Sequence, residues 1–318
     1  MKYINFDDSF LEVINPKNNL KNGGMLYRVP SSIKDGFNFE YLLFIPNDIK
    51  DHTILVLEGI NYDLDNEIEQ LYEEFKSFKD NIHYVNSKTR YPIICPLISK
   101  NDLLRKIFKN KEERIDKQIV NMIKDAKRRL YDNDIVIDDK LILYGFSSSG
   151  IFVNRFALLH PDIVKLVIAG GVSGTLILPF KKYKNNSLMY PVGIGNIDEI
   201  SDYKVEMFLK IKQFYFQDIN DKVDYYASKD GIPIYNDISN GELKMLYEVL
   251  GRKIETRWKN IRMIYRKVCK NIIFRTYNYG IHSDVTAREL SKKLFEREEV
   301  WSHLDATLNC YSFLYTLH

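Results

Sequence analysis

Residues 141–152 read LILYGFSSSGIF, and this stretch decides the fold class. An apolar run typical of a buried strand leads into three serines bracketed by Gly145 and Gly150, and a helical pattern follows. In such a strand, turn and helix, a serine on a strained turn exposes its hydroxyl above the carboxyl edge of a sheet. Small neighbours let the backbones pass closely. The stretch indicates an α/β protein with a candidate nucleophilic serine.

The register of this motif allows two different serines as the nucleophile. With Ser147 in the role, a glycine stands two positions before it and Ser149 stands two after it. With Ser148 in the role, a glycine fits the later position, but Phe146 would lie against the turn and clash. We therefore predict Ser147. The competing interpretation is a serine-rich helix N-cap, because serine oxygens accept hydrogen bonds from free N–H groups at helix starts.

The length and charge of the chain limit the classes of protein to which it can belong. Its 318 residues are 45% hydrophobic, which fits one α/β domain with insertions, so we expect a single domain over 1–318. The 46 basic and 43 acidic residues give a formal net charge of +3 and are mixed along the chain. No basic face for a nucleic acid is indicated, and we expect no nucleic-acid partner.

The cysteines and the apolar stretches bear on the compartment. Three widely spaced cysteines without a C-x-x-C pair argue against a disulfide framework or a structural zinc site. The N-terminus has acidic residues where a signal peptide has its apolar run, and no stretch approaches the ~20 apolar residues of a membrane span. We expect a cytoplasmic protein without a membrane span.

Short apolar runs alternate with helical patterns along the chain, which predicts a mainly parallel sheet flanked by helices on both faces. The predicted strands are residues 39–45, 53–58, 91–97, 141–144, 166–169, 213–217 and 271–277. The predicted helices are residues 64–78, 115–131, 151–159 and 285–295.

Three further segments lie outside this alternation. Residues 172–212 and 222–270 are much longer than ordinary connections of ~4 to 6 residues, and we interpret them as insertions that cover the active site. Residues 300–318 carry apolar side chains at helical spacing beyond the last predicted helix. We expect this helical tail to pack on the domain's own core, and the alternative is a homodimer contact.

A nucleophilic serine needs a base, usually histidine, oriented by a carboxylate. His282 lies just after the last predicted strand, on a loop that would face the same edge of the sheet as Ser147. His160 and His52 fall on the opposite edge, and two further histidines lie in the tail. We predict His282 as the base, against the alternative of an ordinary surface-loop histidine.

The carboxylate is expected after a strand between the serine and the histidine. We predict Asp221, which stands where a strand followed by G-x-x-D normally carries the acid, although Asp218 replaces the turn glycine. Because that glycine is missing, Asp218, Asp224 and Asp198 stay open as alternatives.

The order Ser147, Asp221, His282 is that of the α/β-hydrolase triad, and the chain resembles this family. The resemblance covers roughly residues 35–298 and also rests on LEGINYD after an early strand, on LLHPD at the end of the serine helix and on the AGG turn. A narrower similarity is to a bacterial subgroup with a strand, a G-x-x-D-x-N-D stretch and a later RW helix, represented by QFYFQDIND and ETRWKNIRMIY.

The resemblance implies a site and a reaction. It implies an oxyanion hole from the backbone N–H of Ser148 and from Ile60 or Asn61, although the usual H-G-G motif is absent from that second loop. It implies acyl transfer from a small-molecule acyl substrate to water, with no metal and no organic cofactor. A carboxylic esterase is the least specific expectation. The alternatives are a peptidase or amidase of the same fold, and a binding protein that keeps the fold without turnover.

Overall fold

The structure is a computed structural model that describes residues 12–13, 24–47, 49, 52–59, 91–98, 114–202, 205–224, 238–269, 271–278 and 282. The described residues form two compact units, and the boundary between them falls inside strand β8 (Leu141–Phe146). A single domain over 1–318 stays a prediction. The tail at 300–318 and the predicted helices at 64–78 and 285–295 lie outside the described residues.

The first unit contains a mixed sheet. Its strands stand in the order β1 (Glu12–Val13), β2 (Gly24–Val29), β3 (Tyr41–Pro46), β6 (Ile93–Pro96) and β5 (Val56–Gly59). β5 and β6 pair in parallel, whereas β2 and β6 both pair antiparallel with β3. A separate short parallel pair joins β4 (His52–Thr53) to β7 (Val136–Ile137).

Strand β2 is an element that the apolar runs did not predict. Its residues stand directly after the polar start of the chain, yet Tyr27 and Val29 are buried and Arg28 between them pairs with Glu40. This alternation of buried and partly exposed side chains is typical of a strand near the edge of an antiparallel sheet.

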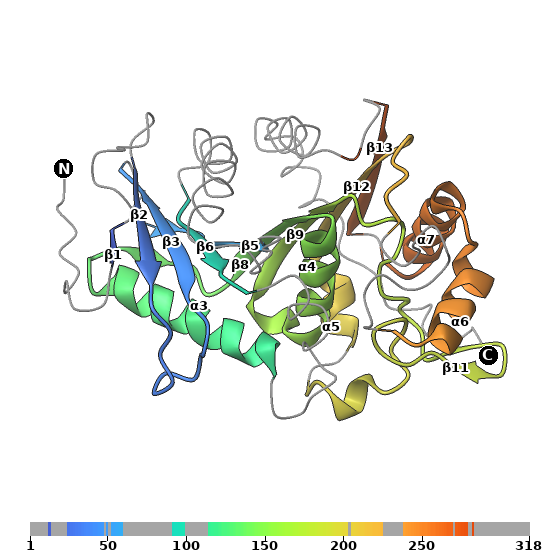
Figure 1. The fold of residues 1–318 in the computed structure, drawn as a ribbon, viewed down its shortest axis with the longest axis horizontal. Helices are drawn as coiled ribbons and strands as arrows, with labels where there is room; N and C mark the ends of the chain where they lie inside the picture. The colour runs from blue at the N-terminus through green and yellow to red at the C-terminus, as the bar shows by residue number, and fades with distance from the viewer. Residues whose placement is uncertain are drawn as a thin grey trace. The chain divides into compact units, whose positions relative to one another are not determined.

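Helix α3 (Ile115–Tyr131) has the predicted bounds and lies against one side of these strands (Figure 1). Its buried side chains recur at helical spacing and include Ile119, Met122 and Ala126. The helix is also fixed by a polar contact, because the hydroxyl of Tyr41 on β3 donates to Asp125 over 2.6 Å.

The second unit contains the sheet that carries the candidate site. Its strands stand in the order β8, β9 (Val164–Gly170), β12 (Lys212–Asp218) and β13 (Ile272–Tyr277). β12 pairs in parallel with both β9 and β13, so these strands end at the same edge. The predicted strands at 141–144, 166–169, 213–217 and 271–277 are confirmed, with ends that differ by a few residues.

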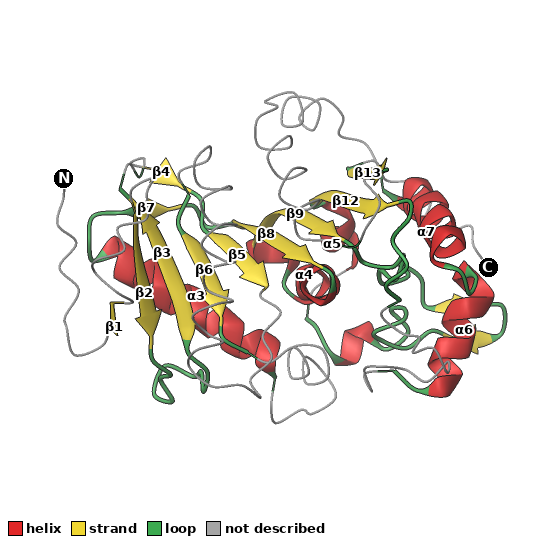
Figure 2. Ribbon diagram, turned by 45° about the horizontal axis from the view of Figure 1, so that its top comes forward, coloured by secondary structure: helices red, strands yellow, loops and turns green. Residues whose placement is uncertain are grey.

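Helices and short elements connect these strands, as Figure 2 shows by colour. They are α4 (Ser148–Leu159), η1 (Pro161–Ile163), the hairpin of β10 (Lys182–Tyr183) and β11 (Asn186–Ser187), η2 (Ile197–Glu199), α5 (Val205–Lys210), α6 (Asn240–Leu250) and α7 (Ile254–Val268). The segments predicted as insertions, 172–212 and 222–270, hold the elements from β10 to α5 and the two helices α6 and α7. That they cover the active site stays a prediction.

Helices α4 and α7 both contact Tyr215 of β12. Asn154 on α4 donates to the Tyr215 hydroxyl over 2.7 Å, and the ring of Tyr265 on α7 lies 6.3 Å from the Tyr215 ring. Since alternate strand residues point to opposite faces, both helices pack on the same face of the sheet. Tyr215 in turn donates to Gln213 over 2.7 Å, so this buried polar group is satisfied and β12 is fixed in place.

Candidate active site

Ser147 occupies a strained turn between β8 and α4. Its φ of 59° and ψ of −126° lie outside the regions that non-glycine residues favour. The turn is held at both ends, because Ser147 N donates to Gly170 O over 2.9 Å and Ile151 N donates to Ser147 O over 3.2 Å. These bonds hold Ser147 at the tip of the turn, beside the end of β9.

The two glycines around the serines stand where a side chain has no room. A β-carbon at Gly145 would lie 2.4 Å from Ser149 O, and one at Gly150 would lie 2.8 Å from Gly170 O. Both obstacles are backbone atoms, which cannot rotate away as a flexible side chain can. The crowding at Gly145 favours the register in which Ser147 stands two residues after a glycine.

Ser149, at the position where the motif usually has a second glycine, is accommodated by hydrogen bonds. Phe146 N donates to Ser149 Oγ over 2.8 Å, and the same hydroxyl donates to Phe146 O over 2.8 Å. The side chain therefore closes the turn from inside, and it is buried. Serine at 149 satisfies two backbone groups of the turn.

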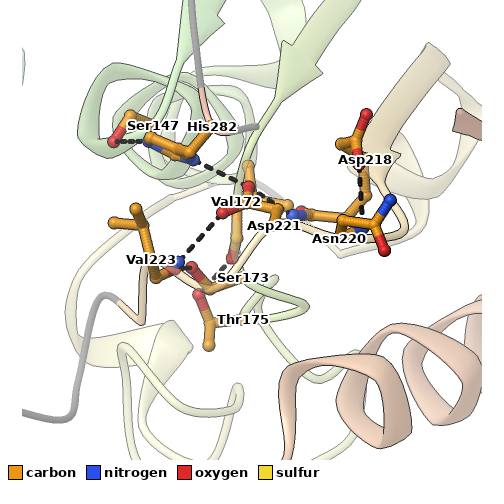
Figure 3. A network of polar contacts seen from close by, with 10 residues as sticks. Ser147, Val172, Ser173, Thr175, Asp218, Asn220, Asp221, Val223 and His282 are labelled. Atoms are coloured by element: carbon orange, nitrogen blue, oxygen red, sulfur yellow. Dashed lines mark hydrogen bonds and ion pairs between the residues drawn. The ribbon is translucent and has the colours of Figure 1, made fainter. Parts of the chain in front are cut away.

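His282 and Asp221 continue from Ser147 in a line of polar contacts (Figure 3). His282 Nε2 lies 3.0 Å from Ser147 Oγ, and His282 Nδ1 lies 2.7 Å from Asp221 Oδ2. With a carboxylate facing it, Nδ1 carries the proton and Nε2 is left to accept from the serine hydroxyl. The imidazole packs on Phe146, with 4.8 Å between the ring centroids.

Asp221 is held by more than the imidazole. The carboxylate is buried, and its Oδ2 also accepts from Gln217 Nε2 over 2.6 Å, while its Oδ1 accepts from Val223 N over 3.0 Å. A buried carboxylate needs such donors, because an unpaired charge away from water is costly. Gln217 stands near the end of β12, so the strand itself orients the acid.

The other candidate acids make different contacts. Asp218 Oδ1 accepts from Asn220 N over 2.8 Å within its own turn. Asp224 Oδ2 lies 2.7 Å from Arg257 Nη2, and Asp198 pairs with Lys181 at the surface. Of the four, the structure brings Asp221 to the imidazole of His282.

The structure describes only some of the other predicted site residues. Ser148 directly follows Ser147 as the first residue of α4, whose first N–H groups point out of the helix start. Ile60 and Asn61 lie outside the described residues, so this half of the oxyanion hole stays a prediction. Among the other histidines, His160 follows the end of α4 and packs on Phe156, with 4.9 Å between ring centroids.

The described residues contain no group of three or more His, Cys, Asp or Glu side chains placed to hold a metal ion. Within the same part of the chain, no helix has both the length and the apolar character needed to cross a membrane.

Several contacts near the site were not found from the sequence. Gln217 binds the acid, Gly171 of the AGG turn lies beside His282, and Ser173 bonds to the backbone of Val223. Gln217 had a detectable pattern, a polar residue within a buried strand. The other two lie on a turn after β9 whose contacts are distant in sequence.

Comparison with known proteins bears on the fold. No family model matches the sequence, and no curated protein matches it. Poly(aspartic acid) hydrolase-1 from Sphingomonas sp. KT-1 is similar with a TM-score of 0.59 and 15% identity, covering 87% of this chain and 100% of that one. LpqC, a poly(3-hydroxybutyrate) depolymerase from Bordetella parapertussis, has a TM-score of 0.57 and 11% identity, covering 86% and 89%. MPT51 (FbpC1) of Mycobacterium tuberculosis has a TM-score of 0.50 and 10% identity, covering 86% and 97%. With these likenesses and its parallel strands, the chain has the α/β-hydrolase fold.

Proposed function

We propose that the protein is a serine hydrolase that cleaves an ester-like acyl bond of a small-molecule substrate. The observation that carries the proposal is the line of contacts from Ser147 Oγ through the imidazole of His282 to the buried carboxylate of Asp221. Serine is a poor nucleophile without a base, and this arrangement supplies one with its orienting acid. Two proteins of similar fold are named as a hydrolase and a depolymerase, which agrees with this class of reaction.

The first half of the reaction forms an acyl-enzyme. Ser147 Oγ attacks the substrate carbonyl while His282 Nε2 takes the hydroxyl proton, and Asp221 stabilises the imidazolium. The oxyanion accepts hydrogen bonds from the N–H of Ser148 and from Ile60 or Asn61, and one such donor contributes roughly 3 kcal/mol. When the tetrahedral intermediate collapses, the leaving alcohol takes the proton from His282.

The second half releases the acyl group. Water attacks the acyl carbonyl while His282 Nε2 takes one of its protons, and the second intermediate collapses to the free acid. The proton then returns to Ser147 Oγ, which restores the starting state. Each step uses the same two contacts of the imidazole, to Ser147 and to Asp221.

Labelling with a fluorophosphonate probe tests the proposal. We expect the wild-type protein and Ser148→Ala to be labelled and Ser147→Ala to be inert, because the probe reacts with an activated serine hydroxyl. Loss of labelling in Ser148→Ala with retention in Ser147→Ala would mean that the register is wrong. A folded wild type that is not labelled would favour a binding protein without turnover.

A matched pair of substrates separates the enzyme classes. The same acyl group is offered as a p-nitrophenyl ester and as a p-nitroanilide. Faster turnover of the ester supports the esterase, and comparable turnover of the anilide would favour a peptidase or amidase.

A further inference from the structure

The end of β9 and the turn after it bond to Ser147, lie beside His282 and bond to the loop that carries Asp221. We call the last residue of β9 and the four that follow it, residues 170–174, the β9 turn. Gly170 O accepts from Ser147 N over 2.9 Å. Gly171, at a φ of +61°, lies so close to the imidazole that a β-carbon there would be 3.0 Å from His282 Cε1. Ser173 Oγ donates to Val223 O over 2.7 Å, two residues after Asp221 (Figure 3).

Val223 transmits that contact to the acid. Its carbonyl accepts from Ser173, while its own N–H donates to Asp221 Oδ1 over 3.0 Å. The peptide groups on both sides of Val223 are therefore bonded, one to the β9 turn and one to the carboxylate. A shift of Ser173 would move the donor that holds Asp221.

Arg257 of α7 contacts both Ser173 and Asp224, the residue after Val223. The side chain is fully buried, with 0% exposed. Its Nε donates to Ser173 O over 2.9 Å, and its Nη2 lies 2.7 Å from Asp224 Oδ2. Because Asp224 follows Val223 directly, the contacts from Arg257 to Ser173, to Val223 and back through Asp224 form a closed ring.

The same arginine is itself tightly positioned. Its Nη1 donates to Arg252 O, and its guanidinium lies 5.5 Å from the centroid of the Tyr247 ring. The β9 turn packs directly on α7 at this point, since a β-carbon at Gly174 would lie 2.7 Å from Trp258 N. The planar fork of arginine can meet Ser173 and Asp224 together, which the single ammonium of lysine cannot reproduce.

Burying a cation in a protein core costs free energy, because the charge loses its hydration. Apolar residues of similar volume often stabilise a core as well as or better than a buried ion pair does. In some proteins such a pair fixes one arrangement of the groups around it, and the groups around Arg257 are the β9 turn and the loop that carries Asp221.

We propose that Arg257, acting through Ser173 and Asp224, is a positioning residue that holds the carboxylate of Asp221 toward His282. This inference rests on the proposed hydrolase function. None of the contacts of Arg257 described above involves Ser147 or the imidazole of His282. Its effect passes through the backbone of Val223.

Three variants test the inference in the full-length protein. Ser173→Ala removes the bond to Val223, and alanine meets the same steric restriction as serine at the φ of 51° of this residue. Arg257→Lys keeps the charge and loses the fork. Tyr265→Phe is the matched control, because it removes another buried bond from α7, the one to Ile177 O at 2.6 Å, which does not reach the loop of Asp221.

The kinetic readout is kcat and KM for a p-nitrophenyl ester, with thermal unfolding measured in parallel. We expect Ser173→Ala and Arg257→Lys to lower kcat roughly ten- to hundred-fold at unchanged KM, because small misplacements of catalytic groups have effects of this size. Tyr265→Phe is expected to unfold at a lower temperature and to keep the wild-type kcat. If the two test variants also lost only stability, the positioning role would be wrong. Should Arg257→Lys fail to fold, Ser173→Ala alone decides.

A second readout does not depend on turnover. The proton shared by His282 Nδ1 and Asp221 Oδ2 is expected to give a low-field resonance in proton NMR, assigned by its loss in His282→Gln. We expect this resonance to weaken or vanish in Ser173→Ala and to persist in Tyr265→Phe. An unchanged resonance in Ser173→Ala overturns the inference. Absence of labelling and turnover in a wild type that shows the resonance overturns the hydrolase proposal instead.

Discussion

Gly171 leaves the space that the imidazole of His282 occupies. A β-carbon at Gly171 would lie 3.0 Å from His282 Cε1 and 2.8 Å from the ring of Phe146. The φ of +61° at this residue also disfavours any side chain. Gly171 therefore permits the positive φ of this turn and also leaves room for the imidazole of His282.

Replacement of Gly171 by alanine is expected to affect activity and stability. The alanine would push the imidazole away from Ser147, so kcat should fall roughly ten-fold or more. The positive φ should lower the free energy of unfolding by about 1 to 2 kcal/mol. Gly251→Ala is the matched control, since Gly251 has a φ of +92° at the end of α6. It should lose at least as much stability in urea unfolding, because a φ of 92° with a ψ of 159° is adopted almost only by glycine, and it should retain full kcat. Equal kcat in both variants would contradict the expectation.

Gly145→Ala tests the crowding inside the turn. Because the new β-carbon would lie 2.4 Å from Ser149 O, the backbone of the turn must move, and we expect fluorophosphonate labelling to be lost. Gly241→Ala is the comparison, because the nearest atom to a β-carbon there is 3.9 Å away and the residue is helical. That variant should gain up to about 0.5 kcal/mol of stability and label normally. Normal labelling of Gly145→Ala would show that the turn tolerates a side chain there.

Asp221→Asn is expected to lower kcat by about 10⁴-fold, because an amide in place of the carboxylate holds the imidazole in the wrong tautomer. Asp198→Asn is the control among the candidate acids. Its ion pair with Lys181 is exposed, so its removal should change the free energy of unfolding by less than about 1 kcal/mol and leave kcat unchanged. Steady-state kinetics of the two variants decide between these acids, and a larger loss in Asp198→Asn would reverse the assignment.

Asp125 on α3 is expected to make the protein sensitive to acid. Burial alone would raise the pKa of Asp125, but hydrogen bonds from Arg129, Tyr41 and Arg128 outweigh it and lower the pKa below its ordinary value of 3.8. The unfolded chain therefore takes up a proton at a higher pH than the folded one. The contribution is fully present above the ordinary value and is lost as pH falls through the lowered value.

Urea unfolding over a series of pH values measures this contribution. Asp125→Asn should be less stable than wild type at neutral pH by about 2 kcal/mol, since hydrogen bonds to a charged group are the stronger ones. The difference between the two proteins should shrink toward low pH. Parallel curves across the whole range would show that Asp125 is not the group responsible.

The strands β8, β9, β12 and β13 and the helices α3 and α4 were predictable because each leaves a local pattern. α3 has its predicted bounds because its apolar residues recur at helical spacing, and β12 has three aromatic residues, Phe214 to Phe216, between polar ones. The motif around Ser147 follows from glycines at fixed offsets. Strand β2 was missed because it directly follows the polar start of the chain and Arg28 interrupts its apolar residues.

The contacts that hold the site were not predictable in the same way. Ser173 and Arg257 are 84 residues apart, and neither stands in a pattern that points to the other. Asp221 could be chosen among four acids only by an analogy of spacing, and the distance to His282 Nδ1 came from the folded chain. Sequence order suggested which residue types meet; the tertiary contacts determine which individual residues do.

The hydrogen bonds of the Ser149 hydroxyl affect which sequence pattern would find proteins with a serine on this kind of turn. Since this side chain bonds to both backbone groups of Phe146, the position two after Ser147 does not require glycine, and the crowded position is Gly150, one residue later. A search pattern that demands glycine two residues after the serine rejects this chain, although its turn holds Ser147 Oγ 3.0 Å from His282 Nε2. A pattern that admits serine there and asks for glycine at the following residue would retrieve chains that close the turn with a side chain.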